Sequence, residues 1–189
     1  MHYGRLPILV FTLALGPAWA AGVEAPGVPN FHQVNGHVFR GGQPVDPGWN
    51  SLAHLGIKVV VDLRPASEHP IGAEQRAVEA AGMKYVNVPM RGVGAPLEDT
   101  VSKVLALMLS EVNGPVFVHC RRGSDRTGTV VACYRILHDH WENQKALQEA
   151  RSYGMYRLER GMMHFIQNFN PSAMSLASGG PLAGSVGLP

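Results

Sequence analysis

The most chemically suggestive stretch of the chain is VHCRRGSDRTG, residues 118–128. Its cysteine, Cys120, directly follows an apolar run rich in β-branched residues, and a Thr-Gly pair suited to the start of a helix closes the stretch. Where a strand ends and a helix begins, backbone N–H groups converge on anions. Such surroundings favour thiolate over thiol and lower a cysteine pKa from about 8.5 to roughly 3.5–7.5. The stretch therefore predicts a thiolate nucleophile beside an anion-binding loop.

The residues after Cys120 are suited to binding a phosphoryl group. The planar guanidinium of Arg126 can hold two phosphoryl oxygens, whereas a lysine offers only a point charge. Gly123 allows the loop to bend so that its amide approaches the anion, and Ser124 is assigned to the same substrate-binding loop. Thr127, where the helix is expected to begin, is predicted to bring a hydroxyl near the sulfur. Phosphoryl transfer depends mainly on positioning and charge stabilisation, so the loop predicts phosphomonoester hydrolysis.

Two further arginines, Arg121 and Arg122, make this loop unusually cationic. One interpretation is that they are solvated surface charges, as most arginines are. The other is that they bind a second phosphate or an acidic flank of the substrate. The second interpretation favours phosphoinositides, inositol phosphates or acidic phosphopeptides over simple phosphotyrosine.

The segments around the loop predict an α/β fold. Apolar runs predict buried strands over 59–63, 85–88 and 116–119. Apolar residues at helical spacing predict helices over 47–55, 67–81, 101–112, from 127 onward, 142–153 and 160–169. Alternating strands and helices indicate a central, mostly parallel sheet flanked by helices on both faces. An Asn-Gly pair at 35–36 predicts a hairpin at the entry to the fold.

At the cysteine loop the sequence resembles the cysteine-dependent protein tyrosine phosphatase superfamily. The signature of that family, His-Cys, five residues, Arg, then Ser or Thr, is matched by His119, Cys120, Arg126 and Thr127. Three more segments are similar to bacterial members of the dual-specificity-like branch: FRGGQP (39–44), KVVVDLR (58–64) and ARSYGMYRLERGM (150–162). The resemblance implies a protein tyrosine phosphatase-like fold over about residues 31–169. It also implies attack by Cys120, a phosphocysteine intermediate hydrolysed by water, and neither metal nor other cofactor.

The general acid departs from the family pattern. Most relatives place an Asp on a mobile loop well before the cysteine, but residues 86–96 contain neither Asp nor Glu. Glu98 and Asp99 follow at a predicted helix start, where carboxylates complement the helix dipole. Asp125 lies inside the signature loop, as in myotubularin-like lipid phosphatases, where such an Asp is held to protonate the leaving oxygen. It equally suits a brace that pairs with an arginine, so all three carboxylates stay candidates.

Several other polar residues are expected to have structural roles. His119 is predicted to brace the loop through a hydrogen bond rather than to shuttle protons. Residues 138–140, His-Asp-His, lack a third spaced ligand for a metal and are predicted to end a helix. Cys133 is predicted to be a small buried apolar residue. Four residues of neighbouring strands are expected to brace the site: Arg40, Gln43, Asp62 and Arg64.

The length and composition of the chain set its organisation. A chain of 189 residues suits a single domain, expected over 31–170 after a linker over 21–30 and before a flexible tail over 171–189. Its net charge of +2, without a run of lysines, argues against binding to nucleic acid. Residues 1–20 combine an early arginine, an apolar stretch and a final Ala-Trp-Ala, which predicts a signal peptide and export to the periplasm or medium. Its apolar stretch is too short to span a bilayer, so no stable membrane insertion is expected after cleavage.

The predicted function is therefore an exported phosphatase acting on a phosphorylated protein, a phosphoinositide or an inositol phosphate. A catalytically weak phospholigand-binding module is the main alternative. Cys120 and Arg126 favour the enzyme, while the missing upstream acid favours the binding module. Sulfur transfer of the rhodanese type fits less well, because the spacing from Cys120 to Arg126 and the following Thr-Gly match the phosphatase signature.

Overall fold

A computed structural model describes residues 22–173 of the chain. The predicted signal peptide, 1–20, lies outside the described residues, as does the predicted tail apart from a short 3₁₀ turn, Pro171–Ala173. Within residues 22–173, none of the helices combines the length and the apolar character needed to span a bilayer.

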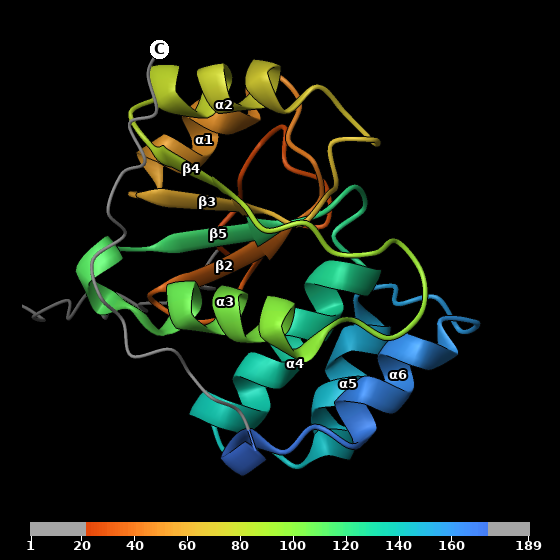
Figure 1. The fold of residues 1–189 in the computed structure, drawn as a ribbon. Coiled ribbons are helices and arrows are strands. Elements are labelled where there is room, and N and C mark those ends of the chain that lie inside the picture. Colours follow the sequence, from red (N-terminus) through yellow and green to blue (C-terminus); the bar gives the residue numbers. More distant parts are fainter. Residues whose placement is uncertain (1–21, 174–189) are drawn as a thin grey trace, which may run out of the picture.

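A five-stranded sheet forms the centre of the described fold (Figure 1). Its strands are β1 (His32–Gln33), β2 (Val38–Gly41), β3 (Val59–Asp62), β4 (Lys84–Asn87) and β5 (Val116–His119). The spatial order is β1-β2-β5-β3-β4, and only the short β1 runs antiparallel to its neighbour. The strand that leads into Cys120 therefore lies in the middle of the sheet, held by parallel partners on both sides.

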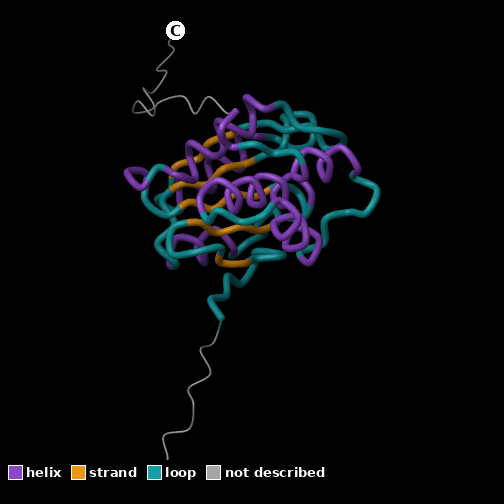
Figure 2. Tube along the Cα trace, turned by 90° about the horizontal axis from the view of Figure 1, so that it is seen from below, coloured by secondary structure: helices purple, strands orange, loops and turns teal. Residues whose placement is uncertain are grey.

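Helices cover both faces of the sheet, which confirms the predicted fold class (Figures 1 and 2). One face carries α1 (Gly48–His54) and α2 (Ile71–Ala80). The other carries α3 (Glu98–Leu109), α4 (Asp125–His138), α5 (Asn143–Ser152) and α6 (Arg160–Gln167). A 3₁₀ turn, Glu111–Asn113, precedes β5.

The alternation of side chains along β5 divides the core into two clusters. Val116 and Val118 belong to the larger cluster beneath α3 and α4, while Phe117 belongs to the smaller one beneath α1 and α2. By the same period of two, His119 points to the α1 and α2 side. Its ring stacks on Phe117 with centroids 5.5 Å apart and meets the edge of Trp49. The strand thus buries His119 on one face before the chain turns into the cysteine loop.

Two predicted helix boundaries are wrong, with consequences for the site. The helix expected from residue 67 begins only at Ile71, because a residue that precedes proline, here His69 before Pro70, disfavours helical backbone. The segment just before it is therefore a turn rather than the first turn of a helix. The helix expected from Thr127 already begins at Asp125, whose carboxylate complements the helix N-terminus.

The predicted linker packs against the rest of the fold within its described part, residues 22–30. Ala25 and Val28 are buried in the smaller core cluster. The side-chain amide of Asn30 donates to the carbonyl oxygens of Arg122 and Tyr153, 3.3 and 3.0 Å away. These residues therefore support the cysteine loop from outside the expected domain boundary.

Candidate active site

The cysteine loop opens onto a pocket of about 520 Å³ at the carboxyl ends of the central strands. The pocket is lined by Glu68, Gly92, Cys120, Arg121, Arg122, Asp125 and Arg126. Cys120 is almost fully buried, with 3% of its surface exposed. The structure therefore brings the predicted nucleophile together with the three arginines and the acidic residue of its loop.

The loop is shaped by a close approach to the segment after β2. Gly123 has a φ of +72°, and a Cβ at this position would lie 2.5 Å from the backbone nitrogen of Gly42. Only glycine tolerates both that conformation and that contact. The backbone N–H of Gln43 also donates to the carbonyl of Arg121, 3.2 Å away. The segment FRGGQP, which contains the predicted bracing residues Arg40 and Gln43, thus packs against the loop.

Arg40 supports the loop from the α5 side of the sheet. Its guanidinium donates to the carbonyl oxygen of Gly123 and lies 4.5 Å over the ring of Tyr153. Burial lowers the pKa of Arg40 to about 10, which leaves it charged at neutral pH. This buried cation adds positive charge on the sheet side of the cysteine loop.

The backbone N–H groups of residues 121–124 have no hydrogen-bond acceptor within residues 22–173. They belong to the bend between β5 and α4, where successive amides can converge on one anion. Ser124 and Thr127 are not among the residues that line the pocket. Ser124 faces Gly154, and Thr127 is fully buried in the first turn of α4. The loop therefore presents its free backbone N–H groups and its arginines to the pocket.

Glu68 forms a two-point ion pair with Arg126, which sequence reasoning missed. Its two carboxylate oxygens accept from Nη1 and Nη2 of Arg126 at 2.8 and 2.9 Å. The Arg126 side chain is 8% exposed and that of Glu68 29%. The pair uses the Nη1–Nη2 edge of the guanidinium and leaves its Nε–H for another acceptor. The signal in the sequence was Pro70, which keeps the helix from starting before it and so leaves Glu68 in a turn.

Asp125 is held from two sides at the edge of the pocket. One carboxylate oxygen accepts from the backbone N–H of Tyr156 at 2.7 Å, and the other from Nη2 of Arg122 at 3.1 Å. The pairing with an arginine is the bracing contact that the sequence allowed. Arg122 itself is 72% exposed in its side chain, so this ion pair is screened by solvent.

The two other acid candidates are not brought to this pocket. Glu98 and Asp99 occupy the first turn of α3, as expected of carboxylates at a helix start. Glu98 instead lines a separate hollow with residues of α6. In the segment without carboxylates, residues 86–96, Gly92 is the residue that lines the cysteine pocket.

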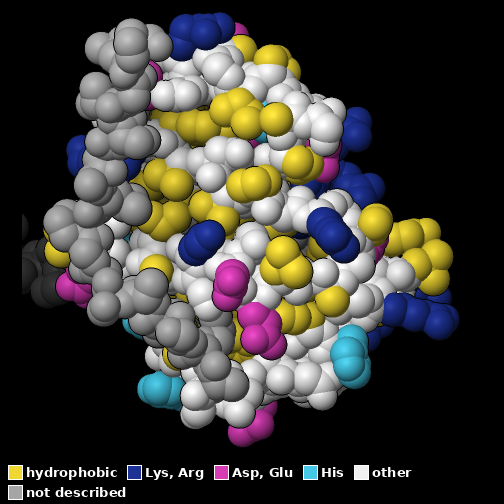
Figure 3. Space-filling view, viewed as in Figure 1, with side chains coloured by type: hydrophobic (Ala, Val, Ile, Leu, Met, Phe, Trp, Pro, Cys, Tyr) yellow, Lys and Arg dark blue, Asp and Glu magenta, His cyan; other side chains and the backbone are white. Residues whose placement is uncertain are grey.

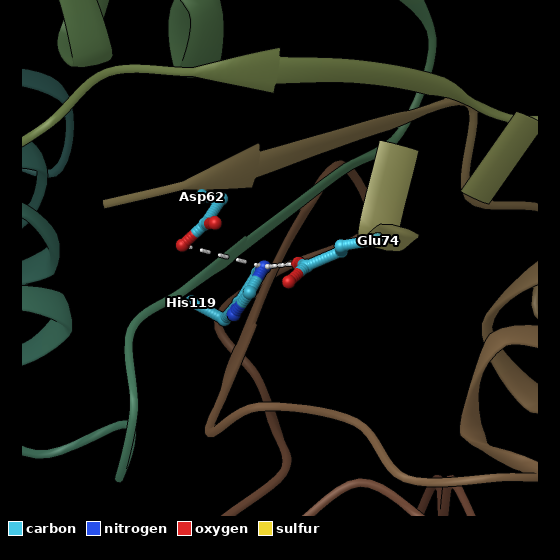
Figure 4. Close-up of side chains that lie close together, drawn as sticks. All are labelled: Asp62, Glu74 and His119. Carbon is cyan, nitrogen blue, oxygen red and sulfur yellow. Dashed lines mark ion pairs between the residues drawn. The ribbon is translucent and has the colours of Figure 1, made fainter. Parts of the chain in front are cut away.

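A buried polar cluster lies behind the loop, on the α2 side of the sheet (Figure 4). Asp62 accepts from Nε and Nη2 of Arg64 at 2.9 and 3.0 Å and from the hydroxyl of Tyr85 at 2.9 Å. Burial acts to raise the pKa of Asp62, but the hydrogen bonds of Arg64 and the charge of His119 hold it below its usual value. Glu74 also pairs with Arg64 and approaches His119. The expected brace from Asp62 and Arg64 is thus part of a larger network.

The same cluster is the place where a metal ion would find ligands among the described residues. Ligand atoms of Asp62, Glu74 and His119 all lie within 4.8 Å of one another. The guanidinium of Arg64 already bonds to both carboxylates, so a metal ion would have to compete with a fixed cation. The arrangement fits a hydrogen-bonded ion cluster better than a metal centre.

The remaining titratable candidates have structural surroundings. Cys133 is fully buried in α4, and burial raises the pKa of its thiol. Helix α4 ends at His138, and Asp139 pairs with Arg135 at 2.7 Å. These contacts agree with the predicted helix end at residues 138–140.

Comparison with known proteins decides the family. The family model described as "DSP-PTPase phosphatase fused to NAD+ Kinase" matches residues 24–167. The chain belongs to this family of dual-specificity-type phosphatases. The predicted resemblance is confirmed, and the matched range includes the packed residues before the expected domain start.

Individual relatives agree with this assignment. Dual specificity protein phosphatase TpbA of Pseudomonas aeruginosa is 30% identical over 139 residues, covering 73% of this chain and 60% of TpbA. Inositol diphosphatase DSP2 of Oryza sativa is 27% identical over 165 residues, covering 82% of this chain and 76% of that protein. The chain thus corresponds to less than two thirds of TpbA.

Solved structures share the fold. The catalytic domain of the PP-IP phosphatase SIW14 from S. cerevisiae has a TM-score of 0.69 and 26% identity, covering 78% of this chain and 89% of that one. The crystal structure of TpbA from P. aeruginosa has a TM-score of 0.66 and 25% identity; the match covers 82% of this chain and 93% of the TpbA chain in that structure. In this dual-specificity-type phosphatase, as predicted, the signature loop joins the central strand to a helix.

Proposed function

We propose that this chain is an exported phosphatase that hydrolyses phosphomonoesters through a phosphocysteine intermediate. The observation that carries the proposal is the cysteine loop. Cys120 lines a pocket together with Arg126, and the backbone N–H groups of residues 121–124 have no acceptor within the described chain. A phosphoryl dianion in that bend would accept from the amides and from Arg126 while the sulfur faces phosphorus.

The reaction proceeds in two displacements at phosphorus. In the first, the Cys120 thiolate forms an S–P bond, the ester P–O bond breaks, and the leaving oxygen takes a proton from Asp125. In the second, water attacks phosphorus, its proton passes to Asp125, and the S–P bond breaks to release inorganic phosphate and the thiolate. Arg126 and the loop amides stabilise the charge on the phosphoryl oxygens in both steps. The scheme requires no metal ion or other cofactor.

Asp125 is the general acid of this proposal because it shares the pocket with Cys120. Glu98 and Asp99 lie in the first turn of α3, away from the lining of that pocket. The N–H of Tyr156 fixes the Asp125 carboxylate at the edge of the pocket. A carboxyl group at that edge can reach the oxygen of a leaving group that points out of the pocket.

We infer that the preferred substrate carries a second acidic group. Arg121 and Arg122 line the pocket and are both exposed, so they offer charge to a ligand beyond the phosphate that is cleaved. Basic side chains recur along the right-hand side of Figure 3, where the carboxyl ends of the strands lie in Figure 1. Among the relatives are inositol diphosphatases, a PP-IP phosphatase and a dual specificity protein phosphatase. An inositol phosphate, a phosphoinositide or an acidic phosphoprotein would meet this requirement.

Turnover of para-nitrophenyl phosphate by the mature protein, and its loss in Cys120→Ser, tests the central claim. Acid quenching during turnover should trap phosphorus on sulfur. Hydrolysis that continues without any trapped phosphocysteine would overturn the mechanism.

Arg121→Gln tests the substrate class. Its kcat/KM should fall about 5- to 30-fold on inositol hexakisphosphate, the range for 1–2 kcal/mol, with little change on para-nitrophenyl phosphate. Arg76→Gln, an exposed arginine on α2, is the matched control. Equal losses on both substrates would show that Arg121 does not select for a second acidic group.

Export rests on residues 1–20 and is tested separately. Expression of the full chain in a bacterial host should yield periplasmic or secreted protein whose mass corresponds to cleavage after Ala20. Full-length protein retained in the cytoplasm would contradict export without affecting the catalytic proposal.

A phospholigand-binding module is the second candidate, favoured by two observations. Residues 86–96 contain no carboxylate, and Asp125 is engaged by Tyr156 and Arg122. Saturable binding of inorganic phosphate without turnover dependent on Cys120 would support this candidate. A thiosulfate assay tests the third possibility, sulfur transfer.

A further inference from the structure

The buried cluster behind the cysteine loop contains two histidines, two carboxylates and one arginine. Asp62 and Arg64 lie on and just after β3, Glu74 in the first turn of α2, and His69 in the turn between them. His119 is the last residue of β5 and directly precedes Cys120. Segments far apart in the sequence thus meet at the residue next to the nucleophile (Figure 4).

The partners of His119 determine where its protons must be. Its Nε2 lies 3.0 Å from Oε1 of Glu74, which is an ion-pair distance, and neither atom makes a hydrogen bond within residues 22–173. Its Nδ1 faces the carbonyl oxygen of Cys120 at 3.4 Å. A carboxylate and a carbonyl are both acceptors, so the ring satisfies both only when each nitrogen carries a proton. Such a ring is an imidazolium.

The charge count of the cluster leads to the same state. Asp62 and Glu74 supply two negative charges, and Arg64 supplies one positive charge. One negative charge would therefore remain in a fully buried site, which is unfavourable unless a proton neutralises it. A proton on His119 makes the cluster neutral.

The second histidine is the other possible place for this proton, but its surroundings argue against it. Nε2 of His69 lies 2.8 Å from Oδ2 of Asp62, but neither ring nitrogen of His69 makes a hydrogen bond among the described residues. Nδ1 of His119 faces the carbonyl oxygen of Cys120, whereas Nδ1 of His69 has no hydrogen-bond partner, so a second ring proton is better placed on His119. The His119 ring also packs against the aromatic rings of Phe117 and Trp49, which carry no charge. Glu74, Asp62 and the carbonyl of Cys120 are therefore the groups that set its protonation.

We propose that Glu74 is a positioning residue for the nucleophile, acting through a doubly protonated His119. Glu74 holds the imidazolium by Nε2, and Nδ1–H of that ring holds the carbonyl of Cys120 at the start of the loop. The positive ring next to Cys120 also favours the thiolate over the thiol. This inference rests on the proposed role of Cys120 as nucleophile.

Glu74→Gln tests the proposal, because the amide can keep its contact with Arg64 but no longer supplies the negative charge. The rate of iodoacetamide alkylation of Cys120, followed by mass spectrometry against pH, should shift its midpoint upward by about one pH unit or more. The kcat should fall while KM changes little. Glu79 is an exposed glutamate on the same helix, and Glu79→Gln should leave the pH profile of alkylation and the kcat unchanged. Coincident alkylation profiles of Glu74→Gln and the unsubstituted protein would overturn the proposal.

A second measurement needs no substitution at Glu74. In the unsubstituted protein labelled with ¹⁵N, both ring nitrogens of His119 should resonate close together, as in an imidazolium, at about pH 7. Two widely separated shifts, typical of a neutral ring, would refute the inference even if Glu74→Gln failed to fold. Alkylation of Cys120 and the ¹⁵N shifts of His119 need no turnover, so failure of the phosphatase proposal and failure of this one can be told apart.

Discussion

The ion pair between Glu68 and Arg126 gives the most specific prediction about catalysis. The Glu68 carboxylate accepts from both Nη atoms of Arg126, which fixes the orientation of the guanidinium relative to the cysteine loop. We expect Glu68→Gln to lose this orientation while keeping the size of the side chain. The result should be a weaker transition-state contact from Arg126.

The magnitude follows from the geometry of the pair. Hydrogen bonds to charged groups contribute about 1.5–3 kcal/mol each when well shielded. Glu68 is 29% exposed in its side chain, so solvent screening reduces the two bonds of 2.8 and 2.9 Å to about a third of their shielded value. We take about 1–2 kcal/mol for the pair, which corresponds to a 5- to 30-fold loss in kcat/KM.

Steady-state kinetics on para-nitrophenyl phosphate, together with inhibition by inorganic phosphate, measure this effect. Glu79→Gln again serves as the control, because that carboxylate is exposed on α2. The opposite outcome, tighter phosphate inhibition and a higher kcat/KM in Glu68→Gln, would refute the reasoning. It would mean that the carboxylate competes with the substrate for the guanidinium instead of orienting it.

Three further predictions concern the acid, the loop and the buried cluster. If Asp125 protonates the leaving oxygen, Asp125→Asn should lose about 10²- to 10⁴-fold on an alkyl phosphate but much less on an aryl phosphate; equal losses would point to a brace. Gly123→Ala should lower the free energy of unfolding by at least about 1–3 kcal/mol in denaturant titrations, because of its φ of +72° and its contact with Gly42; an unchanged midpoint would contradict this. The pKa of Asp62 is lowered in the folded state, so its stabilising contribution is complete above about pH 4 and is lost as pH falls through the folded value. Asp62→Asn should therefore flatten the acid limb of stability against pH, and an equally steep limb would be inconsistent with the ion pair to Arg64.

Local features of the site could be predicted from the sequence because they depend on neighbouring residues. The strand, the bend and the helix that present Cys120 occupy one continuous segment, whose apolar run and Thr-Gly pair mark its parts. The bend at Gly123 was likewise expected from the residue type, whereas its close approach to Gly42 was not. Such features follow from short-range sterics and from hydrogen bonding of the backbone.

Contacts between distant segments could not be predicted in the same way. Glu68 and Arg126 are 58 positions apart, and Arg40 and Gly123 are 83 positions apart. In the sequence, Glu68 looks like an ordinary polar residue near a proline, and nothing local assigns it a partner. Its role depends on the parallel pairing of β3 with β5, which brings the ends of the two strands together.

The sequence by itself determined the nature of the chemistry: a cysteine and an arginine at the spacing of a phosphate-binding loop, on an alternating α/β framework. It also showed that the usual upstream acid is missing. Only the tertiary structure decided which groups surround that loop, namely Glu68 on the guanidinium and the buried carboxylates behind His119. The physical reason is that burial and ion pairing are properties of the folded chain: a carboxylate gains a specific partner only when packing removes both from water.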